Sequence, residues 1–95
     1  MADLAVIPNY EAMVESLGKF IGEVSESCNE MESAGKECVE NCDADEASTK
    51  SNNKLGGCIT KYRETLETAQ NVKAGIQEEL EELYRIRDMI NNMDE

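Results

Sequence analysis

Apolar side chains recur along the first half of the chain at alternating steps of three and four residues. This spacing gathers them on one face of an α-helix and is typical of a helix that packs lengthwise against another. Pro8 stands near the start of the segment, where its fixed φ suits the first turn. The sequence therefore predicts a helix over about residues 8–42, with a seam of Ile7, Tyr10, Val14, Leu17, Ile21, Val24, Cys28, Met31, Gly35, Cys38 and Cys42.

Residues 43–54 lose this periodicity and are rich in Asp, Ser, Thr and Asn, which favour turns, so we expect the connection there. A second helix is predicted over about residues 55–93, with apolar steps that average nearer 3.6 than 3.5 residues. Its stripe consists of Leu55, Cys58, Ile59, Tyr62, Leu66, Ala69, Val72, Ile76, Leu80, Leu83, Ile86, Ile90 and Met93.

Two long helices joined by a short connection predict an all-α fold, an antiparallel two-helix hairpin that forms a single domain over residues 1–95. Two helices of this length form a rod and cannot cover both apolar stripes. We therefore expect a homodimer, or a heterodimer with a related helical protein, that completes a four-helix bundle.

Interior glycines suggest places where the helices approach closely or break. If the turn centres near residue 49, Gly75 lies opposite Gly18 and Gly22. Gly35, beside two small residues, is a candidate break in the first helix.

The chain carries 9 basic and 21 acidic side chains, a net charge of −12, which disfavours binding to nucleic acid and to anionic membranes. The acidic surface is either a solvated face or a docking surface for a basic partner. Without His or Trp, the chain lacks the usual general bases, so we expect no enzymatic activity, no catalytic residues and no cofactor. Residues 1–7 lack the basic and apolar segments of a signal peptide, and no run is long enough to span a bilayer.

All four cysteines fall on the apolar stripes. With the turn near residue 49, Cys58 faces the part of the first helix that carries Cys38 and Cys42, so a Cys42–Cys58 or Cys38–Cys58 disulfide is sterically reasonable. The alternatives are reduced thiols that pack as small apolar side chains and, least favoured because no Cys-x-x-Cys pair or His is present, a zinc site.

Tyr84 and Asp88 lie one helical turn apart beside the second stripe, near the end of the second helix. Residues four apart share a helix face, and Tyr is enriched at protein interfaces. This pair is either a docking patch or a packing Tyr next to an unrelated carboxylate.

The whole chain resembles the WXG/LXG superfamily of small type VII secretion proteins, which share its length, its helical hairpin and a Tyr-x-x-x-Asp/Glu pattern near the C-terminus. The resemblance implies that Tyr84 and Asp88 form an export signal read by the secretion ATPase. Leu55-Gly56-Gly57 is the counterpart of the family's Trp-x-Gly or Leu-x-Gly turn motif, which leaves Leu55 and Gly57 as turn residues.

The resemblance favours a non-enzymatic type VII secretion substrate or export-targeting partner. Such a protein is made in the bacterial cytoplasm, leaves without a cleaved signal peptide, and has an LXG toxin N-terminal domain as one candidate partner. The alternative is a cytosolic coiled-coil adaptor or chaperone, which would keep its cysteines reduced.

Overall fold

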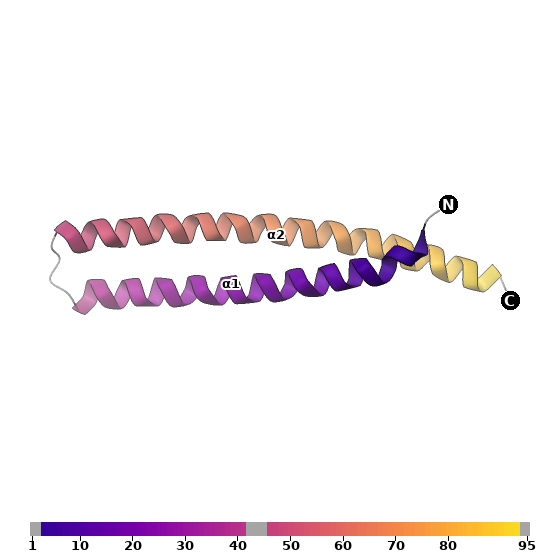
Figure 1. Cartoon of the computed structure of the whole chain (residues 1–95), viewed down its shortest axis with the longest axis horizontal. Helices are drawn as coiled ribbons and strands as arrows, with labels where there is room; N and C mark the ends of the chain where they lie inside the picture. The colour runs from indigo at the N-terminus through magenta and orange to yellow at the C-terminus, as the bar shows by residue number, and fades with distance from the viewer. Residues whose placement is uncertain (1–2, 42–45, 94–95) are drawn as a thin grey trace.

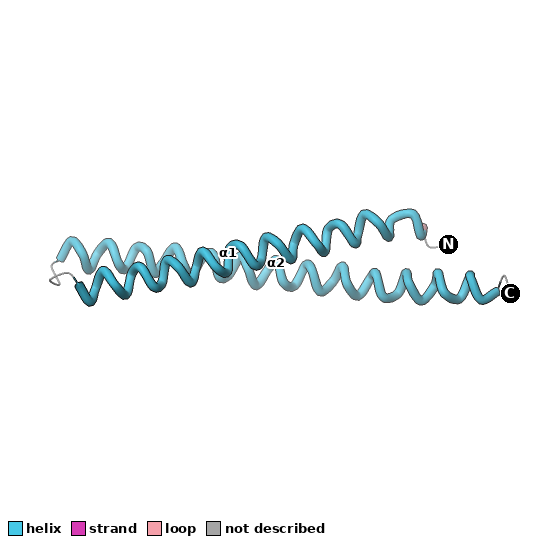
Figure 2. Tube along the Cα trace, turned by 90° about the horizontal axis from the view of Figure 1, so that it is seen from below, coloured by secondary structure: helices cyan, strands magenta, loops and turns pink. Residues whose placement is uncertain are grey.

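Two long helices make up nearly all of the chain in the computed structural model, which describes residues 3–41 and 46–93. A short 3-10 helix, η1, spans Leu4–Val6, α1 spans Ile7–Asn41, and α2 spans Glu46–Met93. Figure 1 shows α1 and α2 lying side by side and antiparallel, and Figure 2 shows them crossing at a shallow angle. The predicted all-α hairpin is confirmed.

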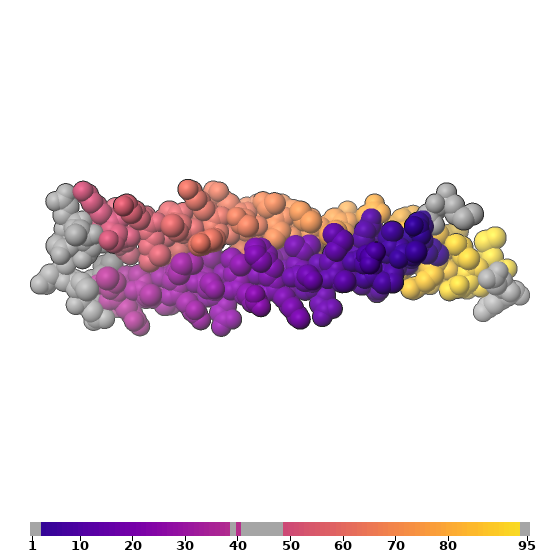
Figure 3. Space-filling view, in the orientation of Figure 1, coloured from indigo at the N-terminus to yellow at the C-terminus, as the bar shows by residue number. Residues whose placement is uncertain are grey.

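The hairpin is a rod. Its Cα atoms extend 74 × 17 × 14 Å with a radius of gyration of 21.4 Å, whereas a globular domain of this length would have a radius near 12 Å. The space-filling view shows α2 reaching past α1 at the end that carries both termini (Figure 3). The last turns of α2 therefore have no neighbour from α1.

The start of α1 is stabilised by local features of the sequence. Asp3 precedes η1, and its Oδ1 accepts a hydrogen bond from the backbone N–H of Ala5 at 3.0 Å. A carboxylate in this position satisfies an N–H that has no partner inside the helix. Pro8 is the second residue of α1, where no intrahelical N–H is required, as predicted.

The predicted seam of α1 is confirmed from Ile7 to Gly35, where every member is buried or half-buried. Cys38, the next member, is exposed, and Cys42 lies outside the described residues. The prediction that Gly35 breaks the helix is wrong, because α1 continues to Asn41. A Cβ on Gly35 would lie 3.1 Å from Asn52 Oδ1 and 3.3 Å from Leu55 Cδ2, so this glycine admits α2 closely.

α2 begins at Glu46, so the prediction that the connection extends to residue 54 is wrong. Turn-forming residues are only weakly unfavourable in a helix, and packing against a neighbour overrides such preferences. Asn52 and Leu55 pack against α1 at Gly35, which shows how this segment gains a partner as a helix.

The register of the two helices differs from the one expected for a turn near residue 49. Ile7 clusters with Leu80 and Leu83 at the open end of the rod, and Leu55 contacts Gly35 near the connection. Gly18 lies beside Lys73, whose Nζ would be 3.8 Å from an added Cβ, whereas Gly75 has no such neighbour within 4 Å. The predicted approach of Gly75 to Gly18 and Gly22 is therefore wrong.

In this register, only part of the predicted apolar stripe of α2 faces α1. The inward positions follow strict steps of three and four and include two polar residues, Asn52 and Lys73, both half-buried. Cys58, Val72, Ile90 and Met93 are exposed instead. We call these positions the α2 seam: Asn52, Leu55, Ile59, Tyr62, Leu66, Ala69, Lys73, Ile76, Leu80 and Leu83. All are buried or half-buried except Tyr62, which is 49% exposed.

Candidate functional site

Tyr84 lies half-buried where the end of α2 meets the beginning of α1. Its hydroxyl donates a hydrogen bond of 2.6 Å to Glu11 Oε2, and the guanidinium carbon of Arg87 lies 4.8 Å from the ring centroid. The hydrogen bond to Glu11 is the largest influence that raises the pKa of Tyr84 above its usual value, and desolvation and the Glu11 charge add to it. Tyr84 thus links the two helices by its hydroxyl while one ring face meets a cation.

Asp88 lies one turn further along α2, and its side chain is 64% exposed. Its Oδ1 is 3.4 Å from Arg87 Nη2, a loose contact between neighbouring residues. Helical spacing puts Asp88 on the same side of α2 as Tyr84. The structure therefore keeps this carboxylate accessible beside the aromatic ring.

A shallow hollow lies beside Tyr84 at the same junction of the helices. It encloses about 430 Å³ and combines apolar walls from Val14 and Leu80 with the carboxylates of Glu11 and Glu81. A hollow of this kind suits a mixed polar and apolar contact with another protein better than it suits catalysis, since it is open to solvent.

One side of the hairpin is joined by polar contacts between the helices. Arg63 Nη2 pairs with Glu32 Oε1 at 2.6 Å, and Tyr84 bonds to Glu11. Each of these four residues immediately follows a residue of its helix's seam. We call this side the polar flank, consisting of Glu11, Glu32, Arg63 and Tyr84.

The opposite side of the hairpin is mostly apolar along the part of the rod that lies toward the termini. The residues that follow seam positions meet on the polar flank. In the same heptad pattern, residues that precede seam positions meet on the other side of the helix pair. We call this side the apolar flank. Its large apolar members are Val6 of η1, Met13 and Phe20 of α1, and Val72, Ile86 and Met93 of α2, with Glu79 between Val72 and Ile86. Toward the connection, the flank continues through the smaller residues Ser27 and Ala34 of α1 and Ser51, Cys58 and Thr65 of α2.

Much of the apolar flank is open to solvent. Phe20 is 41% exposed, Val72 is 49% exposed, and Met93, on the overhanging end of α2, is 81% exposed. Met89 and Ile90 of the overhang are exposed next to this flank. Large exposed apolar side chains that gather on one side of a protein often mark a site where another protein binds.

The apolar pattern of the sequence does not distinguish this flank from the α2 seam. Val72, Ile86 and Met93 were expected to belong to the same stripe as Leu66 and Leu80, because a local apolar pattern does not specify the side on which a neighbouring helix lies. A strict step of three and four from Leu55 would have placed Lys73 inside and Val72 outside.

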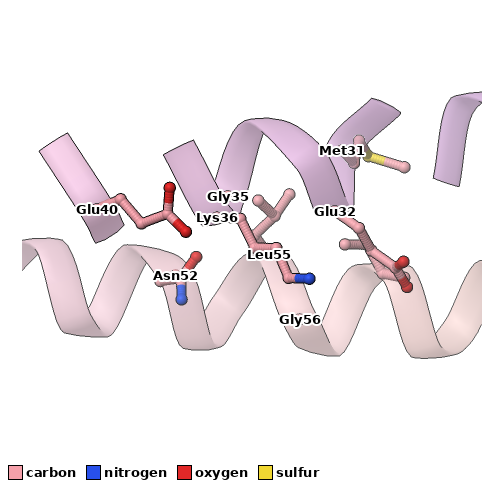
Figure 4. A pocket seen from close by; sticks show the side chains of 9 residues that line it. Met31, Glu32, Gly35, Lys36, Glu40, Asn52, Leu55 and Gly56 are labelled. Carbon is pink, nitrogen blue, oxygen red and sulfur yellow. The ribbon is translucent and has the colours of Figure 1, made fainter. Parts of the chain in front are cut away.

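A second hollow lies between the helices near the connection. It encloses about 410 Å³, and Figure 4 shows Leu55 and Asn52 of α2 beneath α1 at Gly35. Met31 and Ile59 complete its apolar wall, and Glu40 and Lys36 border it. The absence of a side chain at Gly35 lets Asn52 and Leu55 approach α1 closely beside this hollow.

The cysteines occupy different surroundings. Cys28 is fully buried with Ile59 and Leu66, whereas Cys58 is exposed, and both are free thiols. The register places Cys58 level with a part of α1 closer to Ala34 than to Cys38, which disfavours a Cys38–Cys58 disulfide. Cys42 lies outside the described residues, so the proposed Cys42–Cys58 disulfide stays a prediction that the free Cys58 thiol does not support.

The Leu55-Gly56-Gly57 segment does not lie in the turn. It is inside α2, more than two turns after Glu46, where Leu55 packs on Gly35 and Gly57 is exposed. The assignment of Leu55 and Gly57 as turn residues is therefore wrong, because helical structure extends into the segment expected to form the connection.

Within residues 3–41 and 46–93, no three His, Cys, Asp or Glu side chains come together in a group that could hold a metal ion. Across those same residues, neither helix offers a stretch both long and apolar enough to cross a membrane.

These features define a class of molecule: an extended antiparallel helical hairpin with one polar flank and one apolar flank. No protein-family model, curated protein or solved structure matches the chain.

Proposed function

We propose that the protein is a non-enzymatic type VII secretion substrate or export-targeting partner that acts by helical protein–protein binding. Its apolar flank would bind a helical protein and complete a four-helix bundle. Tyr84 and Asp88 would form the signal that the secretion ATPase reads. The N-terminal helical domain of an LXG toxin is one candidate for the bound protein, and a homodimer is another.

The observation that carries this proposal is the separation of the two surfaces. Tyr84 belongs to the polar flank, and Asp88 shares its side of α2, whereas the exposed apolar residues lie on the opposite flank. A helical partner on the apolar flank would leave Tyr84 and Asp88 uncovered. One chain can therefore bind a partner and present an export signal at the same time.

Export of single variants from the native bacterial host tests the signal. We expect Tyr84→Ala and Asp88→Ala each to reduce the exported fraction at least tenfold while intracellular protein, helical circular dichroism and oligomeric state stay as in the wild type. A change of this size corresponds to about 1.4 kcal/mol of lost recognition.

Asn71→Ala and Glu78→Ala are control variants, because both residues are exposed on α2 and lie outside the seam and the Tyr84/Asp88 pair. Both controls should leave with the efficiency of the wild type. Normal export of Tyr84→Ala and Asp88→Ala would contradict the proposed signal.

A cytosolic coiled-coil adaptor or chaperone is the second candidate function. The free thiols of Cys28 and Cys58 favour it, since thiols persist in a reducing compartment. Cell fractionation separates the two functions. A protein found wholly inside the cell while the secretion system is active would favour the adaptor.

A further inference from the structure

Charged residues border the apolar flank at the connection end of the rod. Glu30 and Glu37 on α1, and Lys54 and Lys61 on α2, are all exposed. Glu30 lies one turn before Ala34 on α1, and Lys54 lies one turn before Cys58 on α2. Because residues four apart share a helix face, Glu30 and Lys54 lie next to the apolar flank. Acidic side chains thus line its α1 edge and basic side chains its α2 edge.

These opposite charges stand at matching heights along the rod. In the register that brings Leu55 to Gly35, Glu37 is level with Lys54, and Glu30 is level with Lys61. They lie on the two outer edges of the flank, and among the described residues none of the four takes part in an ion pair. A single hairpin therefore leaves both edges unpaired.

The acidic edge also has a shallow, open depression on the surface of α1. Glu26, Glu30 and Glu37 surround a shallow hollow of about 400 Å³ on α1, where the small side chains of Ser33 and Ala34 leave room. Such a hollow can receive the aliphatic stem of a lysine while carboxylates meet its ammonium group.

We propose that a second copy of this chain covers the apolar flank, with the two rods parallel and related by a twofold axis along their length. In this arrangement, α1 of each copy faces α2 of the other, and Phe20 is level with the second copy's Val72. Glu30 and Glu37 meet the second copy's Lys61 and Lys54. The twofold axis generates two identical rows of these ion pairs, as expected for an isologous interface.

The charges select the parallel arrangement. Both the acidic and the basic residues lie toward the connection, so an antiparallel pair with full overlap would carry each basic edge to the opposite end of its neighbour. Surface ion pairs contribute little affinity but strongly influence which orientation forms. The apolar residues would supply most of the affinity, and the charges would fix the direction.

The overhanging end of α2 fits the same arrangement. Met89, Ile90 and Met93 are exposed beyond the end of α1. In a parallel pair, the overhangs of the two copies lie at the same end of the assembly. They can then cover one another, whereas in an antiparallel pair each overhang would remain alone.

This inference rests on the proposed binding role of the apolar flank and does not depend on export. Its test uses purified full-length protein, whereas the export signal is tested in cells, so either can fail without the other.

Sedimentation equilibrium of four samples tests the interface: the wild type, two double variants and an equimolar mixture of those variants. The wild type should have twice the 10.6 kDa mass of one chain at micromolar concentration. The double variants Glu30→Lys/Glu37→Lys and Lys54→Glu/Lys61→Glu, each alone, should dimerise at least tenfold more weakly, since like charges then face each other. An equimolar mixture should restore the wild-type dissociation constant, because in the mixed dimer each row again places basic side chains of one copy opposite acidic side chains of the other.

A second pair of variants tests the apolar surface. Val72→Asp should weaken dimerisation at least tenfold, whereas Ala74→Asp, on another face of the same turn, should not. Circular dichroism establishes that each variant keeps its helices.

A wild-type chain that stays monomeric throughout the micromolar range would overturn the proposal and leave the flank to a different helical protein. A dimer that is indifferent to the charge reversals, or a mixture that fails to recover, would overturn the parallel arrangement. Equal loss with Ala74→Asp and Val72→Asp would overturn the choice of flank.

Discussion

Tyr84 contributes both to the contact between the two helices and to the proposed export signal. Its hydroxyl bonds to Glu11 across the helix pair, while Asp88 remains exposed beside it. Recognition of Tyr84 by another protein would therefore compete with Glu11. The sequence indicated the spacing of Tyr84 and Asp88, but residue 11 is so distant in the chain that no local pattern could identify it as the partner.

Titration of the phenol tests this contact. With Tyr10 and Tyr62 replaced by Phe, the ultraviolet absorbance of phenolate should report a Tyr84 pKa above the ordinary value of about 10, because the neutral hydroxyl donates to Glu11. Glu11→Gln should lower that pKa, since it removes the carboxylate acceptor and its charge.

The contact also predicts the direction of a pH effect on stability. A pKa raised by folding means that the contribution is fully present below the unfolded pKa and is lost as pH rises through the folded value. The wild type should lose more stability than Tyr84→Phe in this alkaline range. Identical pH profiles for the two proteins would contradict the hydrogen bond.

At the scale of the element, α2 places two polar residues inside its seam. Lys73 lies beside Gly18, and Asn52 lies beside Gly35, where a Cβ would come within 3.1 Å of the Asn52 Oδ1. Polar residues at such positions specify register at a cost in stability. We infer that these two pairings help to exclude shifted alignments of the helices.

Replacing Lys73 with Leu should increase the free energy of unfolding by about 1 kcal/mol, because an apolar side chain in the seam gains burial without desolvating an ammonium group. Lys19→Leu is the matched control, because Lys19 is exposed on α1 outside the seam and the proposed interface, and it should change stability by less than about 0.5 kcal/mol. Urea unfolding measures both. A loss of stability in Lys73→Leu would mean that the amine makes a favourable contact there.

At the scale of the whole molecule, the length of the rod limits how copies can be arranged. A single hairpin extends 74 Å, and a parallel pair with full overlap doubles the mass while leaving this length nearly unchanged. Small-angle scattering of the dimer should therefore give a larger cross-section and a maximum dimension close to that of the single rod. A dimer markedly longer than one rod would indicate staggered or end-to-end association.

The chain's own sequence determines the helices, the antiparallel hairpin and the seam of α1 from Ile7 to Gly35. Alternating steps of three and four residues are a local property, and a helix with such a stripe gains stability by packing lengthwise on another. This periodicity is strict enough in the first half of the chain to identify its inward face without knowledge of the neighbour.

Only the tertiary structure decided the register, the start of α2 at Glu46 and the inward face of α2. Apolar residues on α2 cover two adjacent faces, and the close approach at Gly35 and the Arg63–Glu32 pair select one of them. That choice puts Lys73 inside and leaves Val72 outside. The periodicity of one helix carries no information about how far along its axis, or on which side, the neighbouring helix packs. The apolar flank is therefore defined only by the alignment of the two helices.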